Sequence, residues 1–240
     1  MTNVGELKTS ITGLLGFAAA EEQVLLTGRP DSEDGSPEHW AAVPLIAHNT
    51  DFKSQQVHRL TAISNGQTPE DFAEVDHSSD QTYRRYSVLE PGLVAADSMR
   101  VTSELIDGLR VVSGEDLFDP SRNPWLKGRQ LWLQIVVRGF WHPTGHLADY
   151  YLGHDQPDRA VAMATHAVAW ARYLGVPDAA RGMASYNLAC AQAQAGSLQA
   201  AADAAREAVA LNPELRGKIG TDPDLAPLRD SGILDPAGVI

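Results

Sequence analysis

The stretch VGELKTSITGLLGFAAAEEQVLLT, residues 4–27, indicates the class of fold. Its apolar residues recur at steps of three and four, which is the spacing of one face of an α-helix. That face is made of Val4, Leu7, Ile11, Leu14, Ala18 and Leu25. Gly28-Arg29-Pro30 then breaks the pattern, and residues 31–37 have the polar composition of a loop. We therefore predict a helix over residues 4–27.

The same periodicity predicts three more long helices further along the chain. They are expected over residues 37–63, 91–112 and 124–152. Ser36 is the expected N-cap of the second helix, and Asn65-Gly66 is expected to end it. Residues 67–89 are irregular apart from a short helix expected over 80–86. No segment alternates as a strand does, so the sequence predicts an all-α protein with a four-helix bundle over residues 1–153.

Alanine becomes dense after Gly153, as in AADAAREAVA at residues 201–210. Residues 182–215 match the pattern of small, turn and helix-breaking positions of a tetratricopeptide unit. Residues 157–174 resemble the second helix of a preceding unit. Such repeats usually need about three units to stand alone. We therefore expect residues 154–240 to form a short tetratricopeptide-like helical segment packed on the bundle.

Composition excludes several classes of protein. Nineteen Lys and Arg against 31 Asp and Glu give a net charge of −12 over 240 residues, which argues against nucleic acid and anionic membranes as partners. A single cysteine, Cys190, excludes an internal disulfide and a cysteine-rich zinc site. The chain shows no targeting segment and no apolar run of transmembrane length, so we expect a cytoplasmic protein.

Three histidines form the candidate metal site. His142 and His146 are four residues apart, so they share one face of the fourth helix. His48, on the second helix, is the candidate third ligand from a facing helix. Three histidines and an open position make a catalytic arrangement of ligands, but such a pair of histidines also arises by chance on helices. Pro143 is expected to kink the helix and place His142 near a helix N-terminus.

Other polar and aromatic residues surround these positions in the sequence. Asp51 and Asp149 each follow a histidine, by three residues, and are candidate catalytic carboxylates that orient an imidazole or act on bound water. Each can equally be a solvated helix residue. Arg138, Trp141 and Tyr150 are candidate substrate-binding residues, Arg138 for a carboxylate and the two rings for an apolar pocket. An ordinary salt bridge and bundle packing are the alternatives.

Three runs carry a family resemblance. HWAAVPLIAHNTDFKSQQVHRLTAI, residues 39–63, resembles the second helix of the DinB-like four-helix bundle superfamily, and FWHPTGHLADYYL, residues 140–152, resembles its last helix. NPWLKGRQLWLQ, residues 123–134, resembles the ClbS/DfsB-like branch. The resemblance covers residues 5–153 and implies a divalent metal on His48, His142 and His146. The superfamily includes metal-dependent thiol transferases that use glutathione, mycothiol or bacillithiol, mycothiol-dependent maleylpyruvate isomerase, and a self-resistance hydrolase acting on a reactive genotoxin.

Two classes of function follow from these observations. The first is a metal-dependent enzyme that attacks a reactive electrophilic small molecule by hydrolysis or by thiol transfer, in detoxification or self-resistance. Its metal would be Zn or Ni, with Fe and Mn as further ions that accept such ligands, and a low-molecular-weight thiol would be its co-substrate. The second is a non-catalytic small-molecule-binding protein or interaction scaffold, with the repeat segment docking a partner or forming a homodimer. A bundle that has lost its metal is a third reading.

Overall fold

The computed structural model describes residues 3–28, 35–37, 39–69 and 80–233, and this part of the chain is helical with no strand. It confirms the all-α class. The chain divides into two compact units, residues 1–143 and 144–240. The division falls inside helix α7 (His142–Gly153), whereas the sequence analysis placed the boundary after Gly153. In the described part of the chain, no helix has the length and hydropathy needed to cross a membrane.

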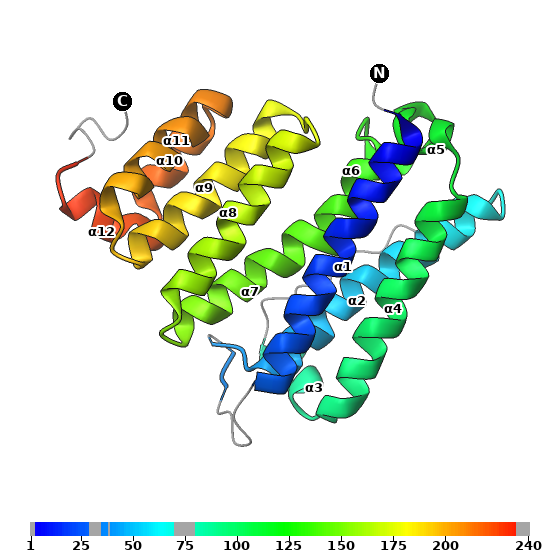
Figure 1. Ribbon diagram of the computed structural model, residues 1–240, viewed down its shortest axis with the longest axis horizontal. Helices are drawn as coiled ribbons and strands as arrows, with labels where there is room; N and C mark the ends of the chain where they lie inside the picture. Colours follow the sequence, from blue (N-terminus) through cyan, green and yellow to red (C-terminus); the bar gives the residue numbers. More distant parts are fainter. Residues whose placement is uncertain (1–2, 29–34, 38, 70–79, 234–240) are drawn as a thin grey trace. The chain divides into compact units, whose positions relative to one another are not determined.

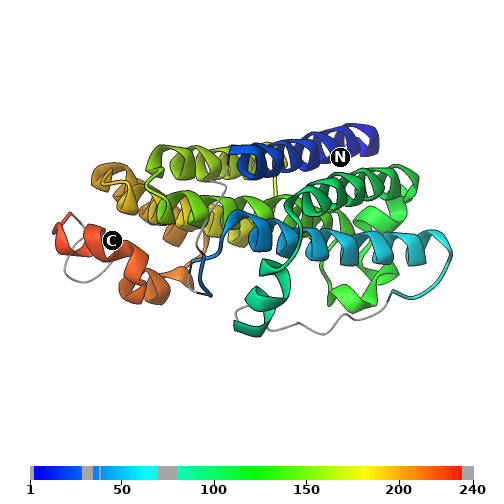
Figure 2. The same ribbon diagram turned by 90° about the horizontal axis from the view of Figure 1, so that it is seen from below.

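Three long helices lie side by side in the first unit (Figures 1 and 2): α1 (Val4–Gly28), α2 (Ala42–Ser64) and α4 (Pro91–Val111). The predicted helices over 4–27 and 91–112 are confirmed to within one residue at each end. The short helix expected over 80–86 is also confirmed, as α3 (Asp80–Ser87). The remaining short elements of this unit are α5 (Gly114–Phe118) and two 3₁₀ turns, η1 (Pro120–Arg122) and η2 (Pro124–Leu126).

The N-terminal part of helix α2 is enclosed, because every residue from 42 to 50 is buried. Its predicted start at Pro37 is wrong, since it begins at Ala42, and Ser36 is not its N-cap. A helix begun at Pro37 would need an N–H at Pro44, which proline lacks. Ser36 and His39 instead exchange backbone hydrogen bonds in a turn. The end was predicted correctly, and Gly66 has the positive φ of +69° that such an ending favours.

The fourth predicted helix begins later than expected, and its predicted start at residue 124 is wrong. Lys127 and Gly128 adopt positive φ angles of 52° and 85°, which a continuous helix does not allow. The helical run is α6 (Leu131–Val136), a π-helical turn η3 (Val137–Trp141) and then α7. Pro143 therefore follows a π turn, and the chain stays helical through it. Because the bonding is already shifted in the π turn, with His142 N–H donating to the Val137 carbonyl, the missing donor of Pro143 is accommodated.

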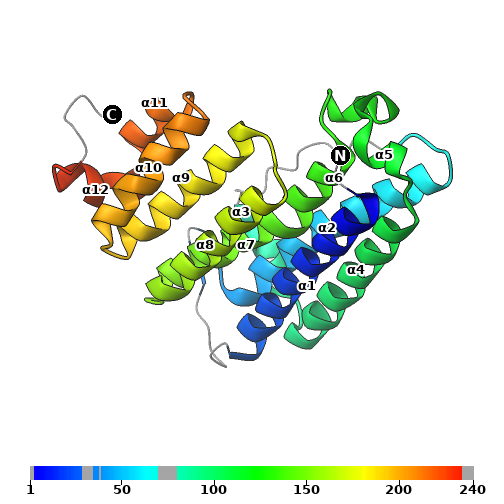
Figure 3. The same ribbon diagram turned by 45° about the horizontal axis from the view of Figure 1, so that its top comes forward.

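After α7, the second unit contains three successive helices, α8 (Pro157–Tyr173), α9 (Asp178–Gln194) and α10 (Leu198–Leu211), and α9 packs against both of the others (Figure 3). A Cβ atom added to Gly182 would lie 2.8 Å from the Asn212 Cβ and 3.0 Å from the Ala208 carbonyl oxygen, so only glycine permits this approach. Helix α8 coincides with the predicted segment over 157–174, and α9 and α10, which span 178–211, overlap the predicted unit over 182–215. Their assignment to the tetratricopeptide class stays a prediction. The unit ends with α11 (Leu215–Thr221), η4 (Pro223–Leu225) and α12 (Ala226–Asp230).

A buried ion pair lies inside the first unit. Lys53 Nζ, on α2, is 2.6 Å from Glu22 Oε2, on α1, and the two side chains are 1% and 0% exposed. Ser98 and Thr102 of α4 complete the cluster, because Ser98 donates to Glu22 over 2.7 Å and Lys53 donates to Thr102 over 3.2 Å. Such hydrogen bonds compensate the desolvation of a charged pair. The cluster joins α1, α2 and α4.

Candidate metal centre

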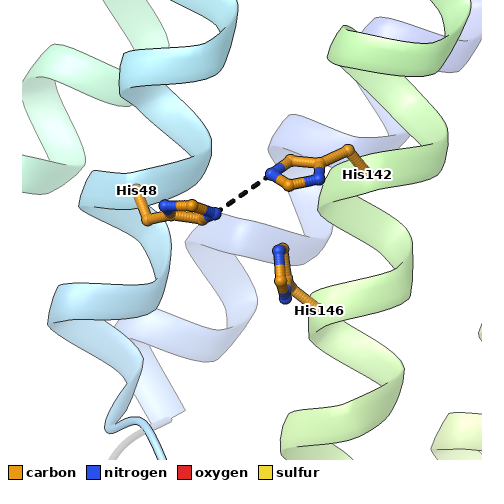
Figure 4. Close-up of side chains that lie close together, drawn as sticks. All are labelled: His48, His142 and His146. Carbon is orange, nitrogen blue, oxygen red and sulfur yellow. Dashed lines mark hydrogen bonds between the residues drawn. The ribbon is translucent and has the colours of Figure 1, made fainter. Parts of the chain in front are cut away.

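Three histidines converge in the structure, as the sequence analysis expected (Figure 4). His48 of α2 and His142 and His146 of α7 each offer a ring nitrogen, and these nitrogens all lie within 4.8 Å of one another. The Nε2 atoms of His48 and His142 are 3.1 Å apart. Two nitrogen ligands of a tetrahedral zinc ion, each at about 2.0–2.1 Å, stand roughly 3.4 Å apart. The separation observed for His48 and His142 is close to this value.

The backbone explains why these side chains meet. His142 and His146 lie one turn apart on the same helix, so their side chains emerge from one face. The π turn that precedes His142 widens the helix by one residue per turn and rotates the following residues about its axis. His48 is 3% exposed on the enclosed part of α2. The ligand set is therefore supplied by residues of two helices rather than by loops.

Aromatic rings surround His48 and His142. The Phe52 ring stacks on the His142 imidazole at a centroid distance of 4.1 Å and an interplanar angle of 28°. It also contacts His48, at 4.9 Å. Trp40 meets His48 edge to face at 5.3 Å, and Tyr86 does so at 6.4 Å. These contacts limit the rotation of both imidazoles and keep water from one side of the site.

Arg138 lies close to this cluster. Its guanidinium carbon is 4.4 Å from the centroid of the Phe52 ring, a cation–π arrangement. Arg138 and His142 thus contact the same ring from positions one turn apart on η3 and α7. The arrangement places a positive charge one aromatic ring away from the histidines.

The first candidate catalytic carboxylate, Asp51, is hydrogen-bonded to Tyr86. Asp51 Oδ2 accepts a very short hydrogen bond from the Tyr86 hydroxyl, and within the described residues this is its one hydrogen bond. The pKa of Tyr86 is raised by burial and by the Asp51 bond and charge. Because the Tyr86 ring also meets the His48 ring, Tyr86 links Asp51 to the site. A catalytic role of Asp51 stays a prediction.

The surroundings of Asp149 in the second unit raise its pKa. Desolvation, and then the like charge of Asp224, raise the pKa of Asp149 to about 6, although Asp149 is exposed at the surface and solvent screens this effect. Cys190 lies in the same neighbourhood, and burial raises the pKa of its thiol to about 12. A thiol with such a pKa is protonated at neutral pH and is a poor nucleophile. A catalytic role of Asp149 stays a prediction.

The remaining candidate substrate-binding residues differ in their surroundings. Trp141 is half-buried and directly precedes His142. Tyr150 is 6% exposed, and its ring stacks on His154 at a centroid distance of 3.9 Å. His154 Nδ1 also lies 2.8 Å from the Tyr150 carbonyl oxygen. Tyr150 is thus engaged with His154 in its own unit, and its role in substrate binding stays a prediction.

Sequence reasoning missed Trp40, Phe52 and Tyr86 as neighbours of the histidines. Phe52 carried a usable signal, because it follows His48 by four residues and so shares its helix face. Tyr86 carried none, since α3 is separated from α2 by a long connection and its position depends on tertiary packing.

Comparison with known proteins finds no match: no protein-family model, no curated protein and no solved structure is similar to this chain at a significant level. The fold and the three-histidine geometry therefore stand on the chain's own structure.

Proposed function

We propose that this protein is a divalent-metal-dependent enzyme that acts on a reactive electrophilic small molecule, by hydrolysis or by thiol transfer. The observation that carries the proposal is the convergence of His48, His142 and His146, with ring nitrogens within 4.8 Å of one another. The resemblance of residues 39–63 and 140–152 to the DinB-like superfamily supports the same ligand set. Detoxification or self-resistance is the proposed biological setting.

The donor set fits a borderline divalent ion. Three imidazoles without a carboxylate or thiolate suit Zn and Ni, and such a set also accepts Fe and Mn. Three protein ligands leave at least one coordination position for water or substrate, which distinguishes a catalytic from a structural site. An ion held there would supply Lewis acidity and lower the pKa of a bound water or thiol.

The chain's own residues would shape the reaction around that ion. Phe52 and Trp40 restrict the His48 and His142 rings, so the ligand geometry is set before substrate arrives. The charge of Arg138, next to Phe52, favours a substrate that carries a carboxylate or another anionic group beside its electrophilic centre. Trp141, half-buried beside His142, offers apolar surface for the substrate body.

Activity assays on metal-loaded protein test the proposal. Hydrolysis is followed with 4-nitrophenyl acetate, and thiol transfer with 1-chloro-2,4-dinitrobenzene and glutathione or mycothiol. We expect turnover in one assay that disappears after chelation and in the His142→Ala/His146→Ala double variant. His58→Ala is the matched control, because His58 is an exposed histidine on the same helix as His48. Equal turnover in the double variant and in the control would contradict the assignment of the site.

A further inference from the structure

A separate cavity lies in the first unit, among α2, α3, α4 and the connection between α3 and α4. Its volume is about 530 Å³, which is within the range of small-molecule sites. The walls include Ala47 and Val94, which are buried, and Leu89 and Leu93, which are 42% and 71% exposed. Neither His48 nor His142 lines this cavity. It is therefore distinct from the candidate metal centre, although Tyr86 borders both.

Asp51 is the least exposed charged residue of the cavity wall. Its Oδ2 atom accepts the Tyr86 hydroxyl, and within the described residues Oδ1 has no hydrogen-bond partner. A carboxylate has about four acceptor positions, so most of the capacity of Asp51 is left for a ligand. The same carboxylate can thus receive an N–H donor from a molecule in the cavity.

The other charges favour a cation. The wall carries three carboxylates, Asp51, Glu90 and Asp97, against two guanidinium groups, Arg85 and Arg100. Arg100 is already neutralised, because it pairs with Asp97 at 2.5 Å and with Glu104, outside the cavity, at 2.6 Å. Arg85 is exposed, and its guanidinium lies over the Tyr86 ring at 5.5 Å. The inner part of the cavity is therefore governed by the negative charge of Asp51.

We propose that this cavity binds a small organic ammonium ion, with its charged nitrogen on Asp51 and its apolar body against Val94, Leu89 and Leu93. An ammonium group donates up to three hydrogen bonds, and a charge-assisted bond to Asp51 adds to the burial of the apolar body. The net charge of −12 also favours the approach of cations. This site goes beyond the proposed metal-dependent function and does not depend on it.

Calorimetric titration with three probes of the same shape tests the proposal: hexylamine, 1-hexanol and hexanoate. The full-length protein is used in the presence of chelator, so the outcome is independent of the metal centre. We expect one equivalent of hexylamine to bind at least about tenfold more tightly than 1-hexanol, with hexanoate the weakest, because a single charge-assisted hydrogen bond is worth about that factor. Asp51→Asn should reduce hexylamine affinity to that of 1-hexanol.

Two further variants make the test independent of any effect of Asp51→Asn on folding. Ala96 lines the cavity and is exposed, so Ala96→Phe should fill the space and weaken the amine and the alcohol alike. Glu104→Gln removes one negative charge from the same helix outside the cavity and should change hexylamine affinity less than twofold. Equal affinity for amine and alcohol, tighter binding of hexanoate, no binding of any probe, or unchanged hexylamine binding in Ala96→Phe would each overturn the proposal.

Discussion

At the scale of single residues, the Lys53 ammonium group is a buried charge of the first unit that is paired with a buried carboxylate. It is 1% exposed, and its counter-ion Glu22 is fully buried. A buried charge left without its partner keeps its desolvation cost, whereas an exposed ion pair is largely replaced by water. Replacing either Lys53 or Glu22 therefore leaves the other charge buried without its counter-ion. Ser98 and Thr102 supply further hydrogen bonds to the same two groups.

Lys53→Ala should lower the free energy of unfolding by about 3 to 5 kcal/mol, because it leaves the Glu22 carboxylate buried and unpaired. The double variant Lys53→Met/Glu22→Leu should recover most of that loss, since an apolar pair of similar volume needs no compensation. Urea unfolding followed by circular dichroism measures both. Arg100→Ala, at an ion pair whose members are more than half exposed, is the control and should cost less than about 1 kcal/mol. Equal losses in Lys53→Ala and Arg100→Ala would contradict this view.

Asp149 predicts a pH dependence of stability. Its pKa is raised from 3.8 to about 6 in the folded chain, so between these values the folded state holds a proton that the unfolded state has released. Stability due to this group is therefore highest at low pH and falls as pH rises from about 4 to about 6. Asp149→Asn should raise the melting temperature at pH 7.5 by a few degrees, roughly 3 °C, because partial exposure screens the effect. It should leave the melting temperature unchanged near pH 3.5, and a gain of equal size at both pH values would argue against titration of Asp149.

Sequence patterns predicted some of these residues and not others. The His142 and His146 pair was predictable, because a spacing of four on a helix fixes which face the side chains share. His48 was predictable as the third ligand only if its helix was expected to face the helix of His142 and His146. The Lys53–Glu22 pair and the contact of Tyr86 with His48 join residues from separate helices, and no local pattern indicates them. They depend on how the helices pack.

At the scale of elements, the π turn before α7 decides where His142 points. Gly139 lies in this turn, where a Cβ atom would overlap the Leu15 side chain of α1 and lie 3.2 Å from Leu105 Cδ2 of α4. Leu15 is 1% exposed and Leu105 is fully buried, so neither can move aside into solvent. The close approach of the turn to α1 and α4 therefore requires glycine at this position.

Gly139→Ala should destabilise the protein by about 1 to 3 kcal/mol through overpacking of the core. It should also weaken metal binding, because the displaced turn directly precedes His142. Gly145→Ala is the matched control: Gly145 is a helical glycine between His142 and His146 with no atom within 4 Å of an added Cβ. That variant should be neutral or more stable by up to about 1 kcal/mol. Thermal unfolding and metal titration of the two variants distinguish them, and equal behaviour would show that Gly139 does not position the turn.

Helix positions followed from sequence where the apolar period runs unbroken, as over residues 4–27 and 91–112. The starts of the second and fourth helices did not. Pro44 denies the second helix the N–H that an earlier start requires, and the left-handed pair Lys127 and Gly128 separates η2 from α6. In each case a single backbone constraint outweighed several residues of favourable periodicity.

At the scale of the whole molecule, helices are the regular secondary structure of the described residues, and α7 contains the division between two compact units. The all-α class followed from composition and period alone. Two finer assignments stay predictions. One is the tetratricopeptide class of the alanine-rich segment, and the other is the DinB-like function of the first unit. Sequence patterns establish which helices form more directly than they establish what those helices bind.

The central claim concerns the three histidines, and metal analysis by mass spectrometry tests it most directly. Protein prepared without a polyhistidine tag is compared with the His142→Ala/His146→Ala double variant and with the His58→Ala control. We predict about one equivalent of a divalent metal in the unmodified protein and in the control, and none in the double variant. Absence of stoichiometric metal after incubation with Zn or Ni, or retention of it in the double variant, would contradict the proposed site.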